Sequence, residues 1–96
     1  MIVVEIGEDH VQLKGHAKYD IVGRDIICAG VSALVFSLIH SLRDLTDDEI
    51  ECSVSEGNVF IKYENLSEQG KLLVDSFFIG ITDMMETYPD YIKLSS

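Results

Sequence analysis

A histidine and a cysteine twelve residues apart are the side chains best suited to chemistry in this sequence. His16 and Cys28 lie in the stretch GHAKYDIVGRDIICAGVSAL, which covers residues 15–34. A thiolate attacks carbonyl carbon readily, and an imidazole can take a proton and return it near neutral pH. The pair therefore has the groups that the nucleophilic hydrolysis of an amide requires.

The cysteine is expected near the start of a helix. Apolar side chains recur at helical spacing and predict a helix from Asp25 to about residue 45; they are Ile26, Ala29, Ala33, Phe36 and Ile39. With Asp25 as the N-cap, Cys28 falls at N3, where unpaired amides would stabilise a thiolate and donate to an oxyanion. Ser32 follows one turn later on the same face, where it would contact the thiolate or line a substrate cleft.

Packing is the alternative role for this cysteine, because free cysteine is among the residue types most often buried. Cys52 is predicted to be structural, since it lies on the apolar side of an alternating strand. His10 is interpreted as a turn residue and His40 as an exposed or helix-end residue. A zinc site that includes His16 and Cys28 has no support from spacing, and neither CxxC nor HExxH occurs. We expect no metal and no organic cofactor.

Alternating apolar residues predict two hairpins and a last short strand. The strands are expected at residues 1–6, 11–14, 50–54, 59–63 and 91–94. Turns are expected at Gly7 to His10 and at the residues SEGN. Strict alternation would place His16 on the face opposite Val11 and Leu13, so we expect a bulge or the strand end at Gly15.

A second helix is predicted between Ser67, its N-cap, and Pro89, which ends it. Its apolar positions are Leu73, Phe77, Ile81 and Met84. The element order is therefore ββαββαβ, which predicts an α+β fold in a single domain, residues 1–96. We expect a mostly antiparallel or mixed sheet with two main helices packed on it.

The segment from Ala17 to Gly23 joins the histidine to the first helix. Few of its side chains are large and apolar, with Tyr19 the largest. We expect it to form a mobile gate over the substrate, hinged at Gly15 and Gly23.

Charge restricts the partners of this chain. Seven Lys and Arg face seventeen Asp and Glu, which gives a formal charge of −10. That field opposes direct binding to a phosphate backbone and attracts a basic partner.

The N-terminus has no basic region before its apolar residues, and the run from Ile26 to Ile39 is shorter than the ~20 residues of a membrane span. We therefore expect a cytoplasmic protein without a membrane segment. Both helices are apolar around more of their circumference than one sheet face requires, which indicates a homodimer.

The opening stretch resembles the signature of the ribosomal-processing cysteine proteases, the Prp family. GHA, a glycine-containing loop and the segment GxDIxCAxxS recur there in this order, and the ββαββαβ order and the length are similar too. The resemblance implies that His16 is the general base and Cys28 the nucleophile, with Asp25 and Ser32 at supporting polar positions.

The same resemblance implies a substrate and an assembly. It points to an endopeptidase that removes a short N-terminal extension from a basic large-subunit ribosomal protein during ribosome assembly, and that acts as a homodimer. The alternative is a non-catalytic acidic dimeric module that binds a basic ribosomal protein or an assembly factor, with Cys28 as packing. Thiol reactivity separates the two, because a packing cysteine reacts slowly with an alkylating agent.

Overall fold

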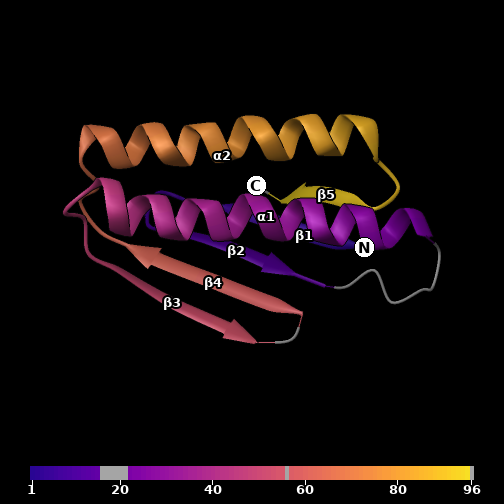
Figure 1. The fold of residues 1–96 in the computed structure, drawn as a ribbon, viewed down its shortest axis with the longest axis horizontal. Coiled ribbons are helices and arrows are strands. Elements are labelled where there is room, and N and C mark those ends of the chain that lie inside the picture. The colour runs from indigo at the N-terminus through magenta and orange to yellow at the C-terminus, as the bar shows by residue number, and fades with distance from the viewer. Residues whose placement is uncertain (16–21, 56, 96) are drawn as a thin grey trace.

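Five strands form one sheet, and two helices cover one of its faces (Figure 1). The computed structural model describes residues 1–15, 22–55 and 57–95. The elements are β1 (Ile2–Ile6), β2 (His10–Lys14), α1 (Val22–Leu45), β3 (Ile50–Ser55), β4 (Asn58–Tyr63), α2 (Glu68–Thr87) and β5 (Ile92–Ser95). The predicted ββαββαβ order and the mixed sheet with two helices are confirmed.

The strands lie in the order β3-β4-β2-β1-β5. The β1–β2, β2–β4 and β3–β4 pairs are antiparallel, whereas β5 lies parallel to β1. Val4 lies opposite Leu13, and Leu13 lies opposite Val59, so alternate side chains of neighbouring strands share one face. That face packs against the helices and leaves β3 and β5 as the two edges of the sheet.

β2 ends where the alternation pattern required an end. Gly15 has a positive φ of 106°, a backbone conformation that side chains other than glycine rarely adopt. Its N–H donates to the carbonyl of Gly57 at 2.9 Å, which ties the end of β2 to the start of β4. The prediction of a strand end at Gly15 is therefore confirmed.

The core lies between the sheet and the inner faces of the helices. From the sheet it includes Ile2, Val4, Val11, Leu13, Ile61, Tyr63 and Ile92. From α1 it includes Ile27, Val31, Val35, Leu38, Ile39 and Leu42. Of the apolar positions that predicted this helix, only Ile39 belongs to the buried stripe, which is offset from the other positions by one to two residues. Ile26 and Phe36 are instead 61% and 40% exposed.

α2 is fixed at its start by the predicted cap. The hydroxyl of Ser67 accepts from the N–H of Gly70 at 3.1 Å. Both the N–H and the hydroxyl of Ser67 donate to the carboxylate of Asp48, at 3.0 and 2.8 Å. These bonds hold the pKa of Asp48 below its ordinary value, chiefly through the Ser67 hydroxyl. The segment after α1 is thereby attached to the start of α2.

The two helices approach each other closely at two glycines, one in each helix. A side chain at Gly30 of α1 would press on the end of Met84, and one at Gly80 of α2 would meet Leu34. Phe77 and Ile81 are buried, and Leu73 and Met84 are half-buried, as predicted for α2. The first half of α1 therefore packs against the second half of α2.

The apolar segment of α1 is longer than the run from Ile26 to Ile39 that was considered from the sequence. The segment from Ile26 to Leu45 has 20 residues and is long and apolar enough to cross a membrane by length and composition alone. The core helix of a soluble protein passes the same test, so this is weak evidence. Here one side of the helix is buried against the sheet.

Candidate active site

Cys28 lies in a groove between the first half of α1 and the tip of the β3–β4 hairpin. The groove has a volume of about 310 Å³. One wall comes from α1 and contains Cys28, Val31, Ser32, Val35 and Phe36. The other comes from the hairpin and contains Val54, Ser55, Gly57, Asn58 and Val59, while Ile2, Leu13 and Gly15 complete the lining.

Helical periodicity places the polar and aromatic side chains of the first wall. Cys28, Ser32 and Phe36 are four residues apart, so they lie along one side of α1. Cys28 is half-buried, whereas Ser32 and Phe36 are exposed. A thiol in this position is open to a peptide in the groove, with a hydroxyl one turn away and an apolar ring beyond it.

The start of α1 corrects two predictions about the surroundings of Cys28. The helix begins at Val22, so Asp25 lies within it and is not its N-cap. Cys28 is the seventh residue of the helix and lies beyond the first turn, whose amides are the unpaired ones. Stabilisation of a thiolate or an oxyanion by those amides is therefore excluded. The prediction failed because the helix continues upstream of the aspartate.

The same boundary corrects the expected hinge at Gly23. This glycine lies in the first turn of α1, so it is not a loop residue. Gly15 lines the groove with a positive φ, and its role as a hinge stays a prediction. His16 and Tyr19 lie outside the described residues, and so does most of the expected gate. Among the residues that the structure describes, no three His, Cys, Asp or Glu side chains gather to hold a metal ion.

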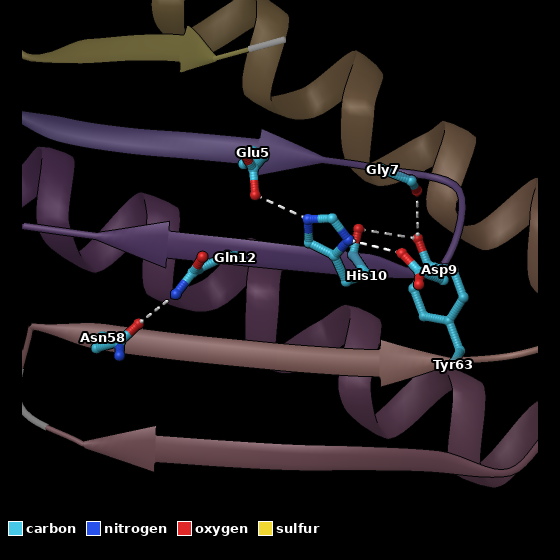
Figure 2. Close-up of polar contacts among 7 residues, drawn as sticks. All are labelled: Glu5, Gly7, Asp9, His10, Gln12, Asn58 and Tyr63. Carbon is cyan, nitrogen blue, oxygen red and sulfur yellow. Dashed lines mark hydrogen bonds and ion pairs between the residues drawn. The ribbon is translucent and has the colours of Figure 1, made fainter.

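A separate polar cluster surrounds His10 at the other end of β2 (Figure 2). The ring nitrogens Nε2 and Nδ1 lie 2.7 Å from Glu5 and 2.8 Å from Asp9. The ring stacks on Phe60, with centroids 5.8 Å apart. Hydrogen bonds to Asp9 and then to Glu5 raise the pKa of His10, and the bond to His10 lowers the pKa of Asp9.

The His10 cluster joins the β1–β2 turn to β4. The turn-residue interpretation was close but incomplete, because His10 is the first residue of β2 and has two carboxylate partners. The Tyr63 hydroxyl donates to the carbonyl of Gly7 at 3.2 Å and lies 3.4 Å from that of His10, which ties β4 to the same turn. None of these residues lines the groove that holds Cys28.

The second wall of the groove was missed by sequence reasoning. Val54 and Val59 were assigned only to a hairpin, and Phe36 only to the apolar positions of a helix. No local signal relates these residues to Cys28, since the sheet order brings the hairpin to α1. Cys52 was placed correctly on the side of β3 that faces the core, where it is half-buried.

Comparison with known proteins shows the family. The profile of the family described as cysteine protease Prp matches residues 1–93. The ribosomal processing cysteine protease Prp of Staphylococcus aureus is 25% identical over 88 residues, which are 88% of this chain and 83% of the relative. The Bacillus subtilis protein of the same name is 22% identical over 92 residues, with 88% of this chain and 82% of the relative covered.

Solved structures agree with this relationship. The S. aureus protease Prp in complex with a covalently linked product peptide matches with a TM-score of 0.88 and 24% identity, over 99% of this chain and 98% of the other. SMU.848 from Streptococcus mutans matches with a TM-score of 0.84 and 28% identity, over 98% and 90%. The chain belongs to the Prp family and is a cysteine protease.

Proposed function

We propose that this protease removes the N-terminal extension of a large-subunit ribosomal protein precursor during ribosome assembly, with Cys28 as nucleophile and His16 as general base. The observation that carries the proposal is the position of Cys28 in an open groove beside Gly15, the residue that precedes His16. The names of the curated relatives supply the ribosomal substrate class.

The reaction has two acyl-transfer steps. His16 takes the thiol proton while the sulfur of Cys28 attacks the carbonyl carbon of the scissile bond. The C–N bond breaks, the amine leaves with the proton from His16, and a thioester to Cys28 remains. A water molecule then loses a proton to His16 and attacks the thioester, which releases the carboxylate and restores the thiol. No metal or redox partner is needed for this balance.

Ser32 and Asp25 have supporting parts in the proposal. The Ser32 hydroxyl lies one helical turn from Cys28 in the same groove, within reach of a bound peptide. Asp25 matches a polar position of the family motif, and we assign it no step of the reaction.

The active form is proposed to be a homodimer in the cytoplasm, where thiols stay reduced. The support is apolar surface that the chain does not cover itself. Large exposed apolar side chains lie on α1 at Ile26 and Phe36 and on α2 at Leu72, Phe78 and Ile79. The charge of −10 would attract a basic ribosomal protein over a distance of about a Debye length.

Incubation with the precursor tests the substrate. The full-length precursor is mixed with the wild-type chain, and both products are weighed intact. We expect two fragments whose masses add to that of the precursor plus one water. A stable complex with an uncut precursor would instead support the non-catalytic module.

A further inference from the structure

The outer edge of β3 is open for pairing with another strand. All six residues of β3 pair with β4 in one uninterrupted register, from Ile50 opposite Tyr63 to Ser55 opposite Asn58. Within the described part of the chain, β4 is its only strand partner. Edge strands are usually protected by proline, by a bulge or by charged side chains, lysine above all. β3 reads IECSVS and has no proline, lysine or bulge, and its one charged side chain is Glu51.

This edge leads from the groove to a second hollow. Val54 and Ser55, at the end of β3, line the groove of Cys28. Ile50 and Glu51, at its start, line a hollow of about 800 Å³. Figure 1 shows β3 as the outermost strand, which extends along the sheet beneath α1. A peptide that leaves the groove along this edge therefore arrives at the second hollow.

Charge indicates which peptide suits this path. The hollow is lined by five carboxylates, those of Asp47, Asp48, Glu49, Glu51 and Glu64, and by two cations, Arg43 and Lys62. One of the carboxylates, Asp48, is already bonded to Ser67. The excess of negative charge complements a basic segment, whereas the groove is mainly apolar apart from Cys28, Ser32, Ser55 and Asn58.

We propose that the substrate segment after the scissile bond adds to β3 as an antiparallel strand, with basic residues over the acidic end. β3 runs from the hollow to the groove, so an antiparallel strand runs from the groove to the hollow. The six residues of β3 at ~3.4 Å each span ~20 Å, which places the basic residues about six or more positions after the cut. Main-chain pairing supplies affinity in such strand addition. The inference rests on the proposed function.

Hydrogen exchange tests the pairing directly. The probe is a synthetic peptide of the precursor that spans the cut and the ten residues after it, added to the Cys28→Ala chain. Amides in residues 50–55 should exchange more slowly with peptide, whereas those of β5, at the other edge, should not change. Unchanged exchange in β3 at saturating peptide, or protection of β5 instead, would overturn the proposal.

Two kinetic experiments extend the test, one with the wild-type chain and modified peptides and one with charge variants of the chain. N-methylation of successive peptide amides after the cut should lower kcat/KM about three- to tenfold at alternate positions, because an added strand donates every second N–H. The pair Glu49→Gln and Glu51→Gln should raise KM about three- to tenfold with kcat preserved. The matched control is Glu86→Gln with Asp90→Asn, two exposed carboxylates outside the hollow, which should leave KM unchanged.

The outcomes separate the two proposals. Strand addition would be overturned if N-methylation lowered kcat/KM at no alternate positions and if the two double variants had equal KM. Cleavage of the precursor in that case would leave the proposed function standing. A wild-type chain that never cuts the precursor would overturn both.

Discussion

At the scale of single residues, the two cysteines differ in their surroundings more than in their burial. Both are half-buried. Both cysteines pack against the core, but Cys28 also lines an open groove in which a serine lies one turn away, whereas Cys52 lies in an edge strand. Because a nucleophile must be accessible to its substrate, the open groove supports the proposed role of Cys28.

This difference predicts the order of alkylation. With iodoacetamide at pH 7, Cys28 should be modified about tenfold faster than Cys52, because His16, the proposed general base, would take the thiol proton as the sulfur attacks. Peptide mass mapping over time measures both rates in one sample. His16→Ala should bring the Cys28 rate close to that of Cys52. Equal rates in the wild-type chain would indicate that Cys28 is a packing residue.

At the scale of elements, the cap of α2 depends on one side chain. Ser67→Ala removes the acceptor for the Gly70 N–H and a donor to Asp48. We expect a loss of about 1 kcal/mol in the free energy of unfolding and a Tm lower by about 4–8 °C. Thermal unfolding followed by circular dichroism measures it. Ser76→Ala, at an exposed position of the same helix, is the control and should change the Tm little.

The β1–β2 hairpin should have a pH-dependent contribution from His10. Its pKa is raised above the ordinary value of 6.5, so its stabilising effect is complete below pH 6.5. The effect is lost as the pH rises through the folded-state pKa. His10→Gln should therefore lower the Tm more at pH 6 than at pH 9. His40→Gln, at an exposed position of α1, is the control. A decrease in Tm on His10→Gln that is equal at both pH values would contradict this account.

Element order was readable from sequence because local patterns set it. Alternation at Val11 and Leu13 and the cap at Ser67 were sufficient for a hairpin and a helix start. The start of α1 was not readable, since Asp25 has the side chain of a cap but Val22 already begins the helix. The buried stripe of that helix was not readable either, because an apolar helix has more than one apolar stripe and only packing on the sheet decides which stripe is buried.

At the scale of the whole molecule, the site required tertiary structure. Cys28 and its motif were evident, but the wall with Val54 and Val59 depends on the order of the strands. The sequence indicated excess apolar surface on both helices, but which of these side chains are exposed depends on which helix face packs on the sheet. Light scattering at micromolar concentration should return twice the chain mass of 10.7 kDa. A mass of one chain at every accessible concentration would contradict the homodimer.

The most direct test of the account is to find the thioester. The wild-type chain is mixed with a precursor peptide that spans the cut, and the reaction is stopped with acid during the first turnover. Intact mass followed by peptide mapping should show the part of the peptide before the cut attached to Cys28. Cys28→Ala should show neither adduct nor cleavage, with a folded circular dichroism spectrum, because alanine is well tolerated in a helix. Cleavage of the peptide by Cys28→Ala at the wild-type rate would contradict the account.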